Sequence, residues 1–187
     1  MIHIAITSPE FIPGEASRIV ELLNNGYDRV HIRKPSASLD AVRQLAIEID
    51  EIYYPRLSFH DHHELAMELG CGIHLNARHP EPPLTWQSSS SHRPFIHMAT
   101  LSASCHTLVE VAEHKKTCDY VFLSPIFDSI SKSGYTSAFT PSELADAAEA
   151  GIIDSQVIAL GGVTPERLQL LSSLGFGGAA FLGHVWK

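Results

Sequence analysis

Short apolar runs alternate with longer segments of helical periodicity along the whole chain, and this alternation most constrains the fold. The run Ile2-Ile6 is rich in β-branched residues and ends at Ser8-Pro9, which is typical of a buried strand. Apolar residues at helical spacing over 38–52 predict the clearest amphipathic helix. The predicted strands are 2–6, 29–32, 57–60, 72–75, 96–102, 120–124, 156–160 and 178–182. The predicted helices are 15–25, 38–52, 62–69, 107–114, one starting near Pro141, and 165–174.

Alternating strands and helices imply parallel strands joined by right-handed crossovers. Eight strands are the number that closes a (β/α)₈ TIM barrel, although periodicity alone leaves an open doubly wound sheet as the alternative. We expect a compact barrel in one domain over residues 1–187, since typical barrels need about 250 residues. No helical pattern follows the last strand before Lys187, so the eighth helix is expected to be missing. The Pro-, Ser- and His-rich segment 76–94 predicts a loop or a weak helix.

Composition narrows the function classes. The chain has 13 Lys and Arg against 21 Asp and Glu, a net charge of −8, which disfavours nucleic-acid binding but not a small anionic ligand. Three cysteines without CxxC spacing predict buried or free thiols in a reducing compartment. Neither a signal peptide nor an apolar stretch of about 20 residues is visible, so a cytoplasmic protein without membrane contact is expected.

In a barrel of this kind, chemistry gathers where the strands end, so the residues after each strand are the candidates. Polar or cationic side chains at these positions are Arg33, Lys34, His60, Asp61, Asn76, Arg78, His79, Ser104, His106, Ser129, Ser131 and Lys132. The cations among them favour an anionic small molecule as the ligand.

Two segments are suited to phosphate. Gly161-Gly162 follows a strand and precedes a helix, where backbone N–H groups can approach an anion; the alternative is a tight turn that needs positive φ. Gly183 follows the last strand in the same way. The Ser129–Lys132 segment supplies two hydroxyls and an ammonium, which suit diphosphate oxygens unless the segment is an ordinary solvated loop.

The histidines invite a metal interpretation. His31, His60, His62, His63, His74 and His79 are the candidates. His62 and His63 are adjacent and diverge on a helix, which favours solvated residues at a helix start. Asp61 could hold Mg²⁺, which prefers oxygen ligands, or could simply cap the following helix.

The ordered motifs together resemble the thiamine phosphate synthase and thiazole tautomerase superfamily. They are VHIRKP (30–35), FHDHHELAMELGCGIHLNARHP (59–80), SASCHTLVEV (102–111), DYVFLSPIFDSISKSG (119–134), ALGGVTPERL (159–168) and GFGGAAFLG (175–183). Their order and spacing match over nearly the whole chain.

The resemblance implies a compact barrel that joins hydroxymethylpyrimidine diphosphate to a thiazole phosphate, giving thiamine phosphate and releasing diphosphate. It implies catalytic roles for Arg33, Ser104 and Lys132 and a Mg²⁺ site at Asp61 and His79. Substrate or phosphate binding is implied at His31, Lys34, His60, Ser129, Ser131, Gly161, Gly162, Leu182 and Gly183. Metal and cationic groups would stabilise the charge that develops on the leaving diphosphate.

The chain departs from the synthase pattern at its diphosphate end. His31 stands for a glutamine, Pro35 for a lysine, His60 for an asparagine and His79 for the second metal-linked aspartate. Ser124-Pro125 is synthase-like, whereas the tautomerase has a catalytic histidine there. A thiazole phosphate isomerase using His31, His60 or His79, and a non-catalytic phosphate-binding protein, therefore stay open as alternatives, as does a homo-oligomer.

Overall fold

The computed structural model describes residues 1–89, 99–128 and 137–186. The eight strands form a closed barrel in chain order, and neighbouring strands pair in parallel, which confirms the predicted (β/α)₈ class over the open sheet. The strands are β1 (Ile2–Ile6), β2 (Arg29–Ile32), β3 (Leu57–Phe59), β4 (Gly72–Leu75), β5 (Leu101–Cys105), β6 (Tyr120–Leu123), β7 (Val157–Ala159) and β8 (Gly178–Phe181).

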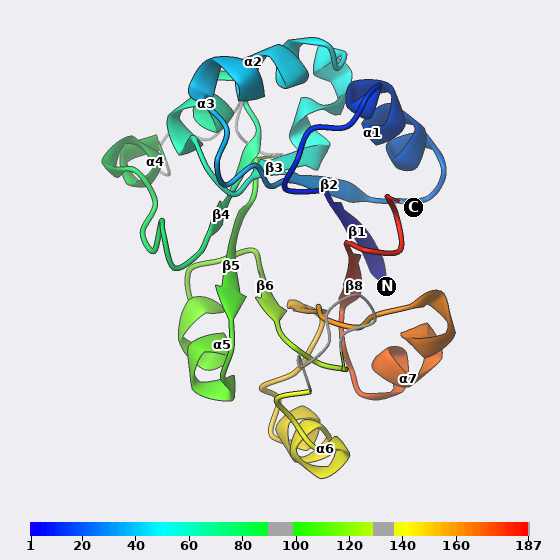
Figure 1. The fold of residues 1–187 in the computed structure, drawn as a ribbon. Helices are drawn as coiled ribbons and strands as arrows, with labels where there is room; N and C mark the ends of the chain where they lie inside the picture. The colour runs from blue at the N-terminus through cyan, green and yellow to red at the C-terminus, as the bar shows by residue number, and fades with distance from the viewer. Residues whose placement is uncertain (90–98, 129–136, 187) are drawn as a thin grey trace. The chain divides into compact units, whose positions relative to one another are not determined.

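Helices follow most strands, as the alternating pattern predicts (Figure 1). They are α1 (Glu15–Asn24), α2 (Leu39–Ile47), α3 (His63–Glu68), α4 (Leu84–Ser89), α5 (Leu108–His114), α6 (Pro141–Glu149) and α7 (Leu168–Ser173), with 3₁₀ helices η1 (Glu51–Arg56) and η2 (Pro165–Arg167). Among the residues described, every helix is too short or too polar to cross a lipid bilayer.

The chain divides into two compact units, Ala5–Leu101 and Met1–Ile4 with Ser102–Lys187. In the first unit, the figure shows α1, α2 and α3 on the same side of β2 and β3 (Figure 1). Strand residues alternate between two faces. Val30, Ile32 and Phe59 are buried on one of them, and the opposite face carries buried polar residues that define the candidate site.

Two predicted elements differ most in their bounds. Strand β5 covers Leu101–Cys105, three residues beyond the predicted end at 102, because Ser102 and Ser104 alternate with apolar residues and no continuous apolar run marks the strand. Residues 96–98 of that prediction lie outside the described residues. The helix predicted over 38–52 ends at Ile47, and a 3₁₀ helix containing Pro55 follows. Proline lacks the N–H that a continuing α-helix needs.

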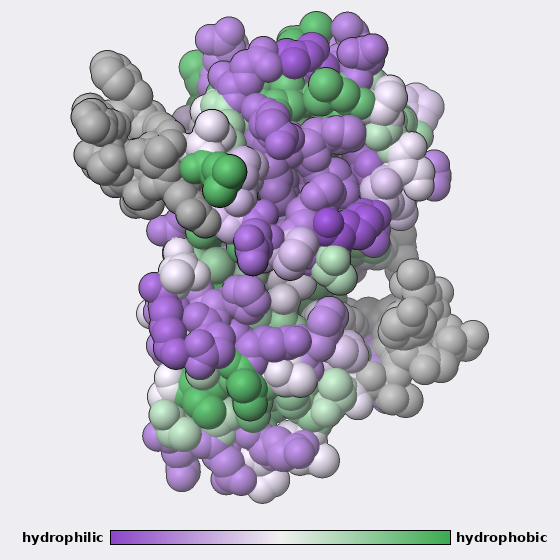
Figure 2. Space-filling view, turned by 90° about the vertical axis from the view of Figure 1, so that its left-hand side faces the viewer, coloured by the Kyte–Doolittle hydropathy of each residue, from purple (hydrophilic) through white to green (hydrophobic). Residues whose placement is uncertain are grey.

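The face shown in Figure 2 is mostly hydrophilic, with apolar residues in separate areas. All three cysteines are buried and unpaired, as their number and spacing predict. Leu84 and Val109 are the most exposed large apolar side chains among the described residues, at 85% and 74%. Scattered exposed apolar residues of this kind are normal on a protein surface.

Candidate functional site

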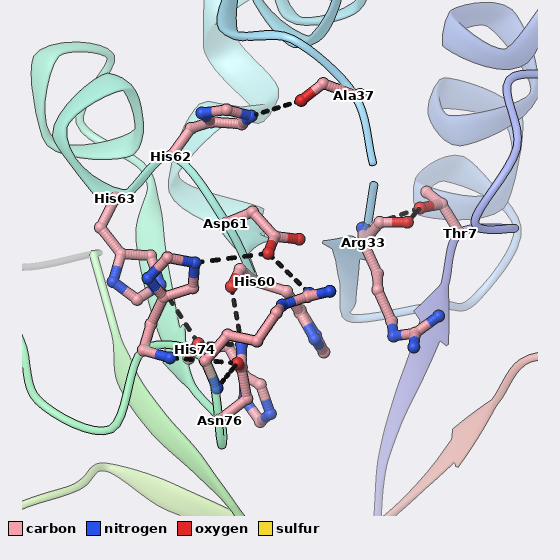
Figure 3. A network of polar contacts seen from close by, with 11 residues as sticks. Thr7, Arg33, Ala37, His60, Asp61, His62, His63, His74 and Asn76 are labelled. Carbon is pink, nitrogen blue, oxygen red and sulfur yellow. Dashed lines mark hydrogen bonds and ion pairs between the residues drawn. The ribbon is translucent and has the colours of Figure 1, made fainter. Parts of the chain in front are cut away.

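The ends of β1 and β2 are tied together by Thr7, which fixes the position of Arg33. The Arg33 backbone N–H donates to Thr7 Oγ1 at 2.9 Å, and the Thr7 N–H donates to the carbonyl of His31 (Figure 3). Thr7 is fully buried, whereas Arg33 is half-buried. The strand end therefore holds the Arg33 backbone rigidly and leaves part of its side chain accessible to a ligand.

Lys34 turns the opposite way into the protein. Its ammonium donates to both carboxylate oxygens of Glu15 at 2.7 and 2.8 Å, and to the carbonyls of Ser8 and Glu10 at 2.8 Å each. It also lies over the ring of Phe11, 4.6 Å from the ring centre. Burial lowers the pKa of Lys34, and the hydrogen bond to Glu15 opposes that shift. This geometry favours a structural role for Lys34 over the phosphate-binding role that the resemblance implies.

Asp61 follows β3, and its carboxylate is contacted by two side chains from the turn after β4. Its Oδ1 accepts a hydrogen bond from Arg78 Nη2 at 2.6 Å and lies 3.5 Å from His79 Nε2 (Figure 3). Its Oδ2 is buried and has no hydrogen-bond partner among the described residues. The alternative role of Asp61 as a helix cap is wrong, because His62 occupies the cap position of α3 and the Asp61 carboxylate turns to Arg78.

Asn76, directly after β4, shapes the turn that carries Arg78 and His79. Its side-chain oxygen accepts from the backbone N–H groups of both residues, at 2.9 and 3.3 Å. Its side-chain amide donates to the carbonyl of His60 at 2.7 Å. The Asn76 side chain therefore links the ends of β3 and β4 and places the Arg78 guanidinium and the His79 imidazole beside Asp61.

Three histidines from successive strands meet on the face opposite the helices. His31 pairs in register with Ser58, and Ser58 pairs with Gly72, so His31, His60 and His74 point to the same side. Nδ1 of His31 lies 3.0 Å from Nε2 of His60. The rings of His60 and His74 stack with centres 4.1 Å apart, and the His31 ring stands edge-on to each at 5.1 Å.

These rings are neutral near neutral pH. All three are buried, with 5% exposure or less, and burial is the main reason that their pKa values fall below the usual range. The pKa of His74 is lowered to about 3, with a smaller effect from His63. Arg29 acts on His31, and Arg33 on His60, in the same direction. Neutral imidazoles keep a lone pair for a hydrogen bond or a metal.

The two histidines at the start of α3 differ from the solvated pair that we expected. His63 is buried, and its Nε2 lies 3.2 Å from the carbonyl of His74. His62 has a left-handed backbone and lies 3.0 Å from the carbonyl of Ala37 through Nε2. Both rings therefore support the backbone around the site, and the expectation of solvated residues is wrong for His63.

The second unit holds the remaining described candidates. Ser104 lies half-buried in β5, and Leu182 and Gly183 follow β8. Gly161 and Gly162 have φ of 92° and 62°, and a Cβ on Gly162 would collide with the carbonyl oxygen of Asp128 and with Phe127. The turn itself thus requires glycine, so these residues provide no separate support for phosphate binding. Ser129, Ser131 and Lys132 lie outside the described residues.

A hollow of about 430 Å³ lies in this second unit, beside α6 and α7. It is mostly apolar, and Phe127 and Arg167 line it, with the guanidinium 4.2 Å from the centre of the ring. None of the predicted site residues that the structure describes contributes to its wall.

Sequence reasoning counted His31, His60 and His74 among six metal candidates but did not single out these three. The signal was the placement of each histidine, since VHI (30–32), FHD (59–61) and IHL (73–75) come from neighbouring strands or their ends. His106, another candidate at the end of β5, has its Nδ1 3.0 Å from the carbonyl oxygen of Ser124.

Comparison with known proteins places these observations in a family. A family model described as thiamine monophosphate synthase matches residues 4–185. A crystal structure of thiamine phosphate pyrophosphorylase from Bacteroides thetaiotaomicron is 38% identical with a TM-score of 0.83; the match covers 100% of this chain and 85% of that one.

Two further matches are more limited. A thiamine phosphate pyrophosphorylase structure from Pyrococcus furiosus, 19% identical with a TM-score of 0.71, covers 97% of this chain and 85% of its own and supports the fold alone. A thiamine-phosphate synthase of Salinibacter ruber is 38% identical over 77 residues, which are 41% of this chain and only 33% of that protein.

Proposed function

Because the chain belongs to the thiamine monophosphate synthase family, we propose that it joins hydroxymethylpyrimidine diphosphate to a thiazole phosphate and releases diphosphate. The observation that carries the proposal is the match over residues 4–185, together with a 38% identical pyrophosphorylase structure that aligns over the full length. The buried Asp61 carboxylate and the half-buried Arg33 follow the neighbouring strands β3 and β2.

One carboxylate oxygen of Asp61, Oδ2, is suited to bind a divalent cation. The buried Oδ2 has no partner among the described residues, and a carboxylate oxygen is the ligand that Mg²⁺ prefers. His79 adds no negative charge and is a poor Mg²⁺ ligand. Mg²⁺ bound there would supply positive charge next to the phosphates of the substrate.

In the proposed reaction, the bond between the pyrimidine methylene carbon and the diphosphate oxygen breaks, and both electrons leave with the diphosphate. The lone pair of the thiazole nitrogen then forms the new carbon–nitrogen bond. Arg33 binds the diphosphate as negative charge grows on it, which is where a fixed cation accelerates the step. Arg78 keeps the Asp61 side chain in one orientation through the 2.6 Å contact.

The test is an assay of wild-type protein with both phosphorylated substrates and Mg²⁺, alongside Arg33→Met and Asp61→Asn. We expect thiamine phosphate from wild type and a loss of about 100-fold or more in kcat/KM in each variant, the usual scale for removing one charge-stabilising group. Glu113→Gln on the surface of α5 is the control and should match wild type.

The proposal would be rejected if the wild-type protein made no more thiamine phosphate than the no-enzyme control. Isomerisation of a thiazole phosphate under the same conditions would assign the chain to the tautomerase reaction. Tight binding of the thiazole phosphate without turnover would identify a binding protein.

A further inference from the structure

We propose that His31, His60 and His74 form a binding site for one divalent transition-metal ion, with Zn²⁺ the preferred occupant. One nitrogen from each of the three imidazoles lies within 4.8 Å of the other two. In a tetrahedral zinc site the ligand nitrogens are about 3.4 Å apart, given Zn–N distances of about 2.0–2.1 Å. The contact of 3.0 Å between His31 and His60 and the limit of 4.8 Å bracket that separation.

The rings also approach the orientation that shared ligation needs. Two imidazoles on one tetrahedral ion have centres about 5 Å apart by the same geometry. The His31 ring stands 5.1 Å from both His60 and His74, at steep angles of 80° and 74°. The stacked pair His60 and His74, 4.1 Å apart, would have to open slightly.

The protonation state is suitable. Burial keeps the three rings uncharged, so binding needs no proton to be expelled from an imidazolium. The proton shared between Nδ1 of His31 and Nε2 of His60 would move to the other nitrogen of its ring, as in any neutral histidine ligand. Net proton release is therefore close to zero at neutral pH.

The chemistry of the ligands selects the metal. Three neutral nitrogens suit Zn²⁺, Co²⁺, Ni²⁺ or Cu²⁺, whereas Mg²⁺ needs oxygen. Three histidines leave the fourth tetrahedral position for water or a small ligand. Arg29 acts on His31 and Arg33 on His60, and both positive charges weaken cation binding. This site is separate from the oxygen site proposed at Asp61.

The ligands come from β2, the end of β3, and β4. A metal held by all three would crosslink these strands in the folded state only, so it would raise the stability of the protein. The site does not depend on the proposed reaction, which uses Arg33 and Asp61.

The experiment is a Co²⁺ titration of the chelator-treated full-length protein at neutral pH, followed by displacement with Zn²⁺. We expect one Co²⁺ per chain, visible absorption of a nitrogen-ligated ion of low coordination number, and a higher Tm with Zn²⁺. His31→Gln and His60→Asn remove one ligand each with residues of similar size. Each should weaken binding by at least about 100-fold, since even loss of an outer-shell partner costs 10–100-fold.

Two control variants test whether Co²⁺ binds at the three histidines. His114→Gln removes an imidazole from α5, and Asp61→Asn removes the carboxylate site; both should retain Co²⁺ affinity within about threefold, less than loss of an outer-shell partner would cause. Absence of 1:1 binding by wild type overturns the proposal, as does full affinity in both His31→Gln and His60→Asn. Loss of binding in Asp61→Asn alone also overturns it. If one histidine variant does not fold by circular dichroism, the other decides.

Discussion

Arg78 Nη2 lies 2.6 Å from Oδ1 of Asp61, and the turn that carries Arg78 is held by Asn76. A cation therefore occupies one oxygen of the carboxylate on which the proposed Mg²⁺ site depends, while the other oxygen has no hydrogen-bond partner among the described residues. The next residue, His79, stands where the family pattern has a second metal-linked aspartate. Mg²⁺ should accordingly bind more weakly here than at a pair of carboxylates.

His79→Asp should strengthen the metal site. The new carboxylate would adjoin Asp61 and supply a second oxygen ligand and a negative charge, so we expect divalent cation binding to tighten by about tenfold. Titration with Mn²⁺, followed by electron paramagnetic resonance, measures the change. His79→Asn is the matched control, because it has the same shape without the charge. Equal affinities in the two variants would contradict a metal site at Asp61.

The stability of the metal-free protein should fall as the pH drops below about 6.5. His74 has its pKa lowered to about 3 in the folded protein, so between these values the unfolded chain binds a proton that the folded chain does not. His74 then contributes a slope of about 1.4 kcal/mol per pH unit, and His31 and His60 act in the same direction. Above pH 6.5 the contribution is constant.

Urea unfolding between pH 8 and 5, in the presence of a chelator, tests this slope. His74→Gln should reduce this slope by the contribution of one histidine, about 1.4 kcal/mol per pH unit. A His74→Gln slope equal to that of wild type would show that the ring is protonated in the folded protein.

Glu15→Gln should strongly destabilise the protein. It would leave the Lys34 ammonium, 1% exposed, without its carboxylate partner, and loss of one member of a buried pair typically costs about 3–5 kcal/mol. The double variant Glu15→Leu with Lys34→Met should recover much of that loss. Glu68→Gln, in the exposed pair with Arg43, is the control and should change the free energy of unfolding far less. Similar losses at Glu15 and Glu68 would refute the buried role of Lys34.

Gly162→Ala should cost more stability than Gly151→Ala. Both glycines have positive φ, 62° and 70°, so each alanine pays about 1–2 kcal/mol for the left-handed backbone. Only at Gly162 would the new Cβ also collide with Phe127 and the Asp128 carbonyl, which should add about 1–3 kcal/mol. Gly151 has open space around its Cβ position. Equal effects in thermal unfolding would mean that the turn after β7 is not tightly packed.

Much of the fold could be predicted because apolar residues recur at different spacings in strands and in helices, and because Gly or Pro marks the ends of many elements. The strand ends that carry Arg33 and Asp61 were therefore located correctly. The helix over 38–52 was overextended because Ile52, which continues the apolar spacing, is 72% exposed. Spacing marks a helical face but does not show whether that face is covered.

The polar contacts of the site were harder to predict. The burial of Lys34 depends on Glu15, nineteen positions earlier, and no local pattern pairs them. The histidine cluster depends on the register of three strands, which a single sequence does not specify. Asp61 shows the same limit, since a carboxylate before a helix is as suitable for capping as for binding a cation.

The most direct test of the central claim is a crystal structure of the protein with Mn²⁺ and diphosphate, in which anomalous scattering locates the metal. We predict a Mn²⁺ ion on Oδ2 of Asp61, bonded to a diphosphate oxygen, with the Arg33 guanidinium contacting the same diphosphate. Diphosphate and Mn²⁺ bound together at a place that touches neither Asp61 nor Arg33 would contradict the proposed site and the reaction built on it.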